Sequence, residues 1–362
     1  MLAYYILFAL IIILSTLNIS VVYQASKCDA ITARKKTYAT EVFILLTLFI
    51  GLRATTVGCD VIQYANKYKN SANFIGSGFS DSEWGYKYLS YFFHDILKVD
   101  FQIFLFFLAI IFSFAVSRCV YKYSNNDLMS FVIYLTLGTF TISLSGLRQT
   151  LAISLVLLSI EQAEKRKLIK FLLLVFVASI IHNSAIIFLP IYFLWGLRIT
   201  RVQSFIILGG TVAAFAYKNL LTPIINFLAP ERYDKYDLSE GYEINLLVVI
   251  VPILMTLFAA VLSKADEDGK LDKKHSFFYI LSCLNVFMLI LSLNNNQLGR
   301  LSYYFSIGCA IIVPATLKKQ NINKVWVKIT EMIIVFLCLL YFFVSTPDGT
   351  LQIDNYKFFW QS

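Results

Sequence analysis

An arginine and a histidine stand in apolar parts of the chain, where ionisable side chains are costly and are functional candidates by default. Arg148 follows a Ser-Gly-Leu turn and carries the only charge between about residues 128 and 160. Its guanidinium stays ionised and presents five donors in a planar fork, which suits a phosphate or a diphosphate. His182 lies in an Ile-His-Asn-Ser stretch and could act as a base or an acid. We predict catalytic roles for both residues; the alternatives are an arginine that extends to lipid headgroups and a structural histidine.

A polar stretch between two apolar runs offers carboxylates beside aromatic rings. Asp60 and Tyr64 are four residues apart, so a helix would place both on one face. Glu83 begins an aromatic segment, and Arg53 lies at the start of the stretch. Aromatic faces stack on sugar C–H surfaces, and carboxylates accept hydrogen bonds from hydroxyls. We predict that Arg53, Tyr64 and Glu83 bind a sugar-containing substrate, and Asp60 is a third catalytic candidate; an ordinary polar loop is the alternative.

Two further arginines lie where loops and predicted helices meet. Arg300 follows a run of Asn and Gln residues, and Arg232 lies in a second polar loop. With Arg53 and Arg148 they indicate a polyanionic ligand, because guanidinium forks pair with phosphate oxygens in a bidentate manner. Gln149 directly follows Arg148, and we predict that Gln149, Arg232 and Arg300 bind the substrate.

The composition places these residues in a membrane protein. Of the 362 residues, 58% are hydrophobic and only 15% are charged, and the mean hydropathy is +0.70. Soluble chains carry roughly a quarter charged residues, so this chain needs an apolar solvent around it. No stretch of the sequence sustains the alternation of apolar and polar residues that is typical of β-strands. Helices are then the elements that can satisfy the backbone hydrogen bonds in lipid. The net charge of +9 lies in short clusters between apolar runs, which argues against nucleic acid as a partner.

The apolar runs predict an all-α, polytopic fold in which residues 1–362 form a single transmembrane domain. A bilayer core needs roughly 20 apolar residues per helix, which gives about twelve spans. The approximate spans are 3–22, 38–52, 100–117, 128–144, 147–162, 168–184, 185–197, 203–222, 244–263, 276–293, 301–317 and 325–345.

The distribution of Lys and Arg predicts the orientation. Short loops rich in these residues alternate with loops that hold fewer, and the positive-inside rule assigns the basic loops to the cytoplasm. Both termini then lie outside, together with two longer segments, 53–99 and 218–243. The first segment contains an aromatic stretch that predicts a helix lying in the membrane interface. Arg148 and His182 begin and end neighbouring helices, so we expect them to lie close together on this outer side.

Signatures of other chemistry are missing from the sequence. It contains no P-loop, no HExxH, no GxSxG and no dinucleotide fingerprint. Its six cysteines match neither a CxxC metal site nor a disulfide framework. We therefore predict no cofactor and no metal, so an activated substrate in the membrane would have to drive any reaction.

Four short blocks resemble the Wzy-type polymerases of O-antigen and capsular polysaccharide, specifically the EpsG-like branch. Their order and spacing match this family across about half the chain. The blocks are Arg53 to Tyr64, Glu83 to Tyr86, Gly146 to Ala152 and Ile181 to Ala185.

The resemblance implies a membrane glycosyltransferase with an architecture related to the GT-C type, in the bacterial inner membrane. Such enzymes join oligosaccharides carried on undecaprenyl diphosphate at the periplasmic face, so donor, acceptor and membrane lipids are the expected partners. A protein that regulates chain length is an additional candidate partner. Arg148 would bind the leaving diphosphate, Asp60 or His182 would accept the hydroxyl proton, and Arg232 and Arg300 would help to hold a lipid diphosphate.

Three other functions remain open on the sequence. A flippase for lipid-linked sugars would show internal repeats and polar residues along a whole path, whereas these residues gather at one face. An O-antigen ligase would share the donor and the arginine chemistry. A multipass acyltransferase would need ionisable groups towards a cytoplasmic donor, where His275 stands in a charged loop.

Overall fold

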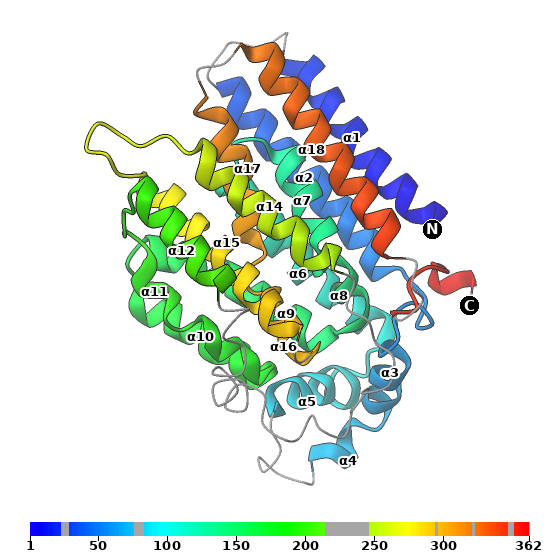
Figure 1. Cartoon of the computed structure of the whole chain (residues 1–362). Coiled ribbons are helices and arrows are strands. Elements are labelled where there is room, and N and C mark those ends of the chain that lie inside the picture. The colour runs from blue at the N-terminus through cyan, green and yellow to red at the C-terminus, as the bar shows by residue number, and fades with distance from the viewer. Residues whose placement is uncertain are drawn as a thin grey trace. The chain divides into compact units, whose positions relative to one another are not determined.

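The computed structural model describes residues 1–22, 29–75, 83–213, 246–293, 296–320, 323–346 and 351–361 (Figure 1). These residues form helices and two isolated β-bridges but no strand, which confirms the all-α prediction. Among them, four helices are long and apolar enough to cross a membrane, and five shorter apolar helices accompany them. The polytopic count of about twelve spans and the GT-C-like architecture stay predictions.

The chain divides into two compact units, and a single transmembrane domain stays a prediction. The first unit consists of Met1–Leu128, Phe140–Tyr192 and Thr346–Ser362. In it, α2 packs on α1 and α6, and α9 packs on α6 and α10. These helices are α1 (Leu2–Val22), α2 (Asp29–Gly51), α6 (Phe101–Tyr123), α9 (Leu147–Glu164) and α10 (Leu168–Ile181).

Short helices of the first unit gather where α9 begins. Buried side chains of α3, α5, α6 and α9, among them Tyr68, Tyr86, Phe104 and Leu147, form one apolar cluster there. Residues 84–96 are helical and lie within 53–99, and the interfacial helix expected in that segment stays a prediction. The short elements are α3 (Val61–Lys69), α4 (Ser71–Ile75), α5 (Trp84–Tyr91), the π-helical η2 (Phe92–Ile96) and α8 (Phe140–Ser145).

The segment after α10 runs back along that helix. It consists of the 3-10 helix η4 (Asn183–Phe188) and the short α11 (Ile191–Leu194). The ring of Tyr192 lies 5.3 Å from that of Phe171, near the start of α10. A 3-10 helix rises about 2.0 Å per residue against 1.5 Å in an α-helix, so few residues cover the return. The spans predicted at 168–184 and 185–197 appear as short apolar helices, Leu168–Ile181 and Asn183–Leu194.

The two ends of α9 carry different polar groups. Arg148 stands in its first turn, whereas Glu161 near its last turn pairs with Arg118 at 3.1 Å and with Lys122 at 3.4 Å. Lys35 of α2 pairs with Asp127 at 3.5 Å. Glu161 lies 13 residues after Arg148 in α9, so its ion pairs lie about 20 Å from Arg148 along the helix axis.

The second unit comprises Met129–Thr139 and Phe193–Ser345. α15 (Lys273–Ser292) lies at its centre and packs against four helices. The unit also contains most of α7 (Asp127–Tyr134), the π-helical η3 (Leu135–Thr139), α12 (Arg201–Ala213), α14 (Leu247–Leu262), α16 (Asn296–Ser302), α17 (Ile307–Lys318) and α18 (Lys324–Ser345).

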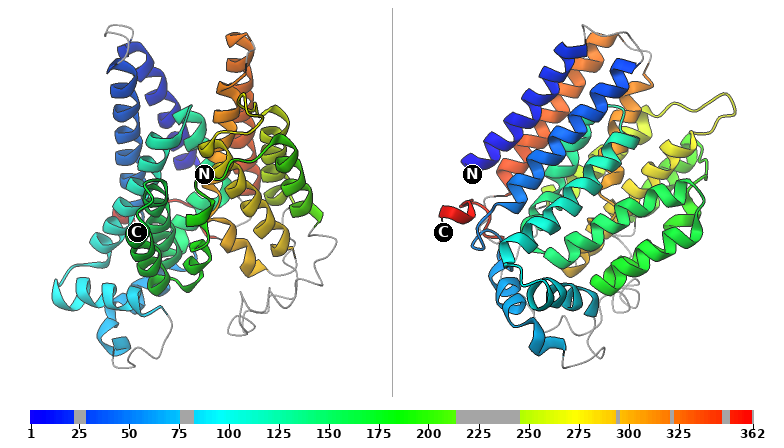
Figure 2. Two further views of the ribbon diagram at one scale, coloured as in Figure 1. Left: turned by 90° about the vertical axis from the view of Figure 1, so that its left-hand side faces the viewer. Right: turned by 180° about the vertical axis from the view of Figure 1, so that it is seen from behind.

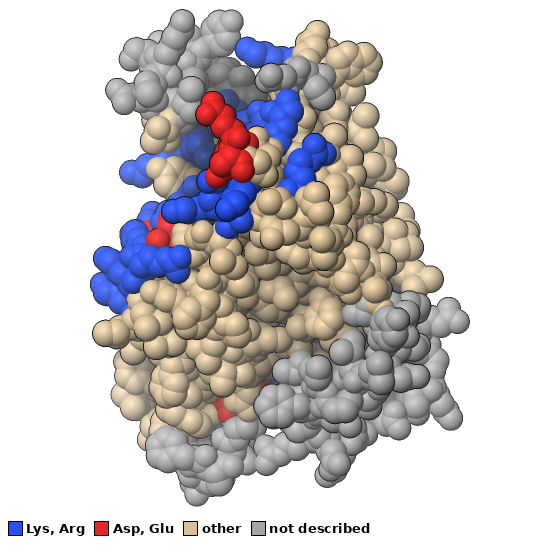
Figure 3. All heavy atoms as spheres, turned by 60° about the vertical axis from the view of Figure 1, so that its left-hand side comes forward, with Lys and Arg blue, Asp and Glu red and all other residues tan. Residues whose placement is uncertain are grey.

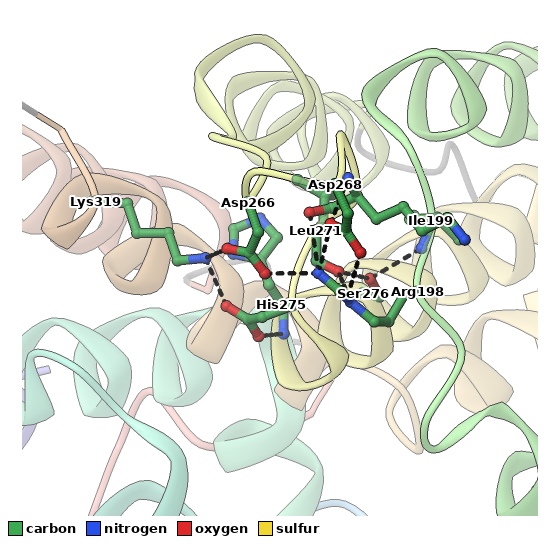
Figure 4. A network of polar contacts seen from close by, with 10 residues as sticks. Arg198, Ile199, Asp266, Asp268, Leu271, His275, Ser276 and Lys319 are labelled. Atoms are coloured by element: carbon green, nitrogen blue, oxygen red, sulfur yellow. Dashed lines mark hydrogen bonds and ion pairs between the residues drawn. The ribbon is translucent and has the colours of Figure 1, made fainter.

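Three connections of the second unit are tied together by charged side chains (Figure 4). Arg198, before α12, donates to Asp266 and Asp268 between α14 and α15, at 2.7 and 2.9 Å. Lys319, after α17, pairs with Asp272 at 2.6 Å. The sequence assigns all three connections to one side of the membrane, and the structure brings them together.

Apolar side chains are exposed along several helices. On α18, Trp326, Met332 and Phe336 are each more than 60% exposed, and Ile169 on α10 is 82% exposed. Figure 3 shows charged side chains gathered in one region of a face, next to a broad area without them. Such a surface fits lipid rather than water, as expected of a membrane protein.

Candidate functional site

Glu83 joins the two residues that the sequence singles out. One of its carboxylate oxygens accepts a hydrogen bond from Arg148 Nη1, and the other lies 2.5 Å from His182 Nδ1. The Glu83 side chain is only 8% exposed. Arg148 and His182 therefore meet, as expected of the ends of an α9–α10 hairpin, and a buried carboxylate holds them together.

Tyr64 supports the guanidinium from a second side. Arg148 Nε donates to the Tyr64 hydroxyl at 3.2 Å, and the guanidinium carbon lies 5.6 Å from the centre of the tyrosine ring. A cation over an aromatic face is attracted by the ring quadrupole. The Arg148 side chain remains 37% exposed, so part of this side chain is accessible to a ligand.

The backbone of Glu83 adopts the left-handed conformation, with φ 69° and ψ 31°. This conformation costs a non-glycine residue roughly 1–3 kcal/mol, and such residues cluster at functional sites. The hydrogen bonds to Arg148 and His182 oppose this cost. The strained turn thus directs the carboxylate towards both partners at the start of α5.

The charge state of Glu83 follows from these contacts. Burial alone raises the pKa of a carboxyl group. The hydrogen bond and charge of His182, the charge of Arg148 and a hydrogen bond from the Asn183 backbone outweigh burial and lower the pKa of Glu83 below its ordinary value. Glu83 is therefore ionised at neutral pH.

Two glycines permit the close packing that forms the site. A Cβ atom at Gly85 would lie 2.9 Å from the carbonyl oxygen of Ile180, so α5 can lie this close to the end of α10 only without a side chain there. Gly58 has φ +102°, and a Cβ atom on it would lie 2.0 Å from the carbonyl oxygen of Leu144. The loop before α3 therefore lies directly against the turn before α9.

Residues 351–361 complete the same end of the first unit. The N–H groups of Ala54, Gly58 and Cys59 donate to the carbonyls of Lys357, Gln352 and Leu351 at 2.9–3.1 Å. The N-terminal amine donates to the carbonyl of Asp354 at 2.6 Å, so both terminal segments lie at this end of the unit (Figure 2). No sequence motif points to this pairing.

The comparison with known families covers the same segments. The sequence model of the EpsG family matches residues 36–358, which include every residue of the cluster. The chain belongs to the EpsG family. No curated protein and no solved structure matches it significantly. The resemblance drawn from the four sequence blocks is confirmed, and membership suggests a function of the polysaccharide-polymerase type.

Arg53 of this EpsG-family chain is fully buried, which distinguishes it from Arg148. It donates to the carbonyl of Ile50 at the end of α2, and to those of Ser143 and Leu144 at 3.3 and 3.2 Å. These carbonyls end helices and lack intrahelical partners. Arg53 thus joins two helix ends, and its predicted role in substrate binding, which these contacts do not support, stays a prediction.

Of the other four predicted residues, the structure describes three. Asp60 precedes α3, and its carbonyl accepts from the Tyr64 N–H at 3.0 Å, so the expected helical spacing is present. Gln149 is buried in α9, 3% exposed. Arg300 is exposed in α16 of the second unit, and Arg232 lies outside the described residues. The roles of these four residues stay predictions.

A polar pocket of about 220 Å³ opens beside the cluster and contains two lysines that the sequence analysis missed. Residues 64, 67 and 71 recur with helical spacing, as do 83, 87 and 90, so periodicity could have identified both lysines. Among the described residues, no group of three or more His, Cys, Asp or Glu side chains could hold a metal ion. The pocket lining includes Tyr64, Lys67, Glu83, Lys87, Ser90 and Arg148.

Proposed function

We propose that this chain is a polysaccharide repeat-unit polymerase that joins undecaprenyl-diphosphate-linked oligosaccharides at the periplasmic face of the bacterial inner membrane. The observation that supports this best is the buried Glu83, which holds both a cation and a histidine beside a pocket with two lysines. A diphosphate needs the cations, and a hydroxyl nucleophile needs a base.

The proposed reaction is glycosyl transfer between two lipid-linked saccharides. A hydroxyl oxygen of the acceptor forms a bond to the anomeric carbon of the growing chain. The bond from that carbon to the diphosphate breaks, and undecaprenyl diphosphate leaves with the electron pair. The hydroxyl proton passes to a base of the protein, so the donor's own diphosphate ester supplies the driving force.

His182 is the base that the geometry supports. With Nδ1–H donated to the Glu83 carboxylate, Nε2 carries the lone pair that can accept the hydroxyl proton. The carboxylate fixes this tautomer and stabilises the imidazolium that forms. Asp60, the other candidate from the sequence, has no comparable orienting partner among the described contacts.

Arg148 binds the leaving diphosphate in this proposal. Glu83 and Tyr64 fix its guanidinium before substrate arrives, which is the condition for stabilising charge that grows in the transition state. Lys67 and Lys87 add positive charge to the same pocket. Because these side chains supply the charge, we propose a metal-independent reaction.

The test compares polymer made by cells carrying Arg148→Ala with polymer from the wild type. Loss of a fixed electrostatic donor lowers rates by about 10²–10³. We therefore expect lipid carriers with single repeat units and no long chains. Persistence of long chains, with the variant present in the membrane at normal level, would refute the diphosphate site.

Deletion of the chain separates the alternatives. A polymerase defect leaves single units exposed at the outer face and available for transfer. Loss of all exported glycan would indicate a flippase, and full-length polymer left on its lipid carrier would indicate a ligase.

A further inference from the structure

A second, larger depression lies on the other side of Glu83. It is an apolar groove of about 880 Å³ along the exposed face of α10, lined by Leu172, Leu173, Phe176 and Ile180. Leu173 and Phe176 are each 62% exposed, although both are large apolar side chains. The lining extends from Ile169 to Ile180, about 17 Å along the helix axis.

The groove is apolar along its length and polar at one end. Ile186 and Leu189 of the returning segment form its second wall, and Glu83, Trp84 and Asn183 close the polar end. One helix face and one short segment form its two walls, an elongated shape that suits an extended chain lying along α10.

Glu83 lines both the groove and the polar pocket that contains Arg148. A ligand that occupied both would place an apolar chain along α10 and an anionic head beside Arg148, Lys67 and Lys87. The two depressions therefore match the two halves of an anionic lipid with one long chain, and charge complementarity fixes its direction.

We propose that the groove on α10 holds the polyprenyl chain of a lipid-diphosphate saccharide and thereby aligns its diphosphate with Arg148. This inference rests on the proposed function, whose substrate it locates. Lipid tails are as apolar as leucine, so transfer of a chain from bilayer to groove gains little hydrophobic free energy. The groove then contributes position, and the cationic pocket contributes most of the affinity.

Photocrosslinking of the full-length protein in nanodiscs tests the proposal. The probe is a polyprenyl diphosphate with a photoreactive group on the chain, and peptide mass spectrometry locates the label. We expect label on residues 172–189, removed by excess unlabelled polyprenyl diphosphate but retained in excess phosphatidylglycerol. Equal competition by phosphatidylglycerol would identify ordinary bilayer lipid, and label confined to other helices would also overturn the proposal.

A filled groove provides the matched comparison. Leu173→Trp places a larger side chain in the groove, whereas Leu48→Trp changes an exposed leucine of α2, 43% exposed, that does not line it. We expect labelling to fall about tenfold in Leu173→Trp and to stay within about twofold in Leu48→Trp, since pocket changes of this size alter binding by tenfold or more. Equal labelling of both variants would contradict the proposal.

The outcome is independent of the polymerase test. Crosslinking reports binding and requires no turnover, so it can succeed even if Arg148→Ala leaves polymer intact. Conversely, if the label lies elsewhere while Arg148→Ala abolishes polymer, the groove is wrong and the proposed reaction stands. The wild-type map alone decides the question if Leu173→Trp does not fold.

Discussion

A single carboxylate organises the candidate site. Arg148 and His182 come from the two ends of a helical hairpin, and Glu83 reaches both from a turn in the left-handed conformation. Removing its charge leaves a guanidinium and an imidazole that are no longer fixed relative to each other. The roles proposed for Arg148 and His182 therefore depend on Glu83.

Glu83→Gln should lower polymer synthesis by at least about 10², the lower end of the range for general acid–base catalysis. The amide keeps the shape of the side chain but cannot stabilise an imidazolium. Glycan length on lipid carriers measures the effect. Glu267→Gln, a change of an exposed glutamate in the second unit, is the control, and equal polymer in both variants would contradict the role of Glu83.

The lowered pKa of Glu83 predicts how stability depends on pH. A carboxylate with a lowered pKa stabilises the fold fully above its unfolded value, about 4.3, and this contribution is lost as pH falls through the lowered pKa. The difference in melting temperature between wild type and Glu83→Gln should persist from pH 7 to about 5 and shrink below about 4. A difference that already vanished at pH 6 would contradict this assignment.

Arg53 and Arg148 show that the sequence identifies candidate arginines but does not distinguish a buried one from an accessible one. Both are arginines beside polar turns, and both were predicted to meet substrate. Only packing separates them, because backbone carbonyls surround Arg53 whereas Arg148 remains partly exposed. The meeting of residues 83, 148 and 182 likewise depends on tertiary contacts that local patterns do not contain.

At the level of elements, the contact of α5 with α10 brings Glu83 to His182. Apolar runs predicted α9 and α10 near their observed bounds. In lipid, a long apolar segment satisfies its backbone hydrogen bonds by forming a helix. They did not predict that η4 is a 3-10 helix running back along α10. The spacing of apolar residues in a short 3-10 helix differs little from that in a short α-helix. Two changes test how far these elements control the site.

Gly85→Ala should destabilise the protein by about 1–3 kcal/mol, the usual cost of inserting a methyl group into a packed contact. The new Cβ would meet the backbone of Ile180, which cannot rotate away. Thermal unfolding in detergent measures the loss. Gly209→Ala in α12, where nothing lies within 4 Å of the new atom, should be neutral or stabilising; an equal loss in both would refute the packing argument.

Lys67→Ala should raise the KM for the lipid diphosphate about tenfold, because a charge-assisted hydrogen bond contributes roughly 1.5–3 kcal/mol. Lys69 is also exposed on α3 but does not line the pocket, so Lys69→Ala should leave KM within about twofold. The comparison uses purified protein and measures product formation against substrate concentration. A similar rise in both variants would indicate a general charge effect.

At the scale of the whole molecule, the arrangement of charge predicts the membrane orientation. The candidate site and the paired basic residues of the first unit occupy opposite ends of α9. If the basic end faces the cytoplasm, as the positive-inside rule predicts, the site faces outward. The distribution of Lys and Arg in the sequence is enough to predict this orientation. The number of spans cannot be predicted without knowing the conformation of every short helix.

Single cysteines in a background without the native six test this orientation. Lys69→Cys near the site should react with a membrane-impermeant thiol reagent in intact spheroplasts. Lys170→Cys near the start of α10 should react only after permeabilisation. The reverse pattern would place the candidate site at the cytoplasmic face and exclude the proposed periplasmic reaction.

The pairing of residues 351–361 with the loop before α3 also bears on biogenesis. The ribosome releases Ala54, Gly58 and Cys59 long before the segment whose carbonyls accept their N–H groups. Contacts of such high sequence separation form late and slow folding. The end of the first unit that holds the candidate site therefore stays incomplete until this segment has been synthesised, and partly inserted chains would lack these contacts during their own synthesis.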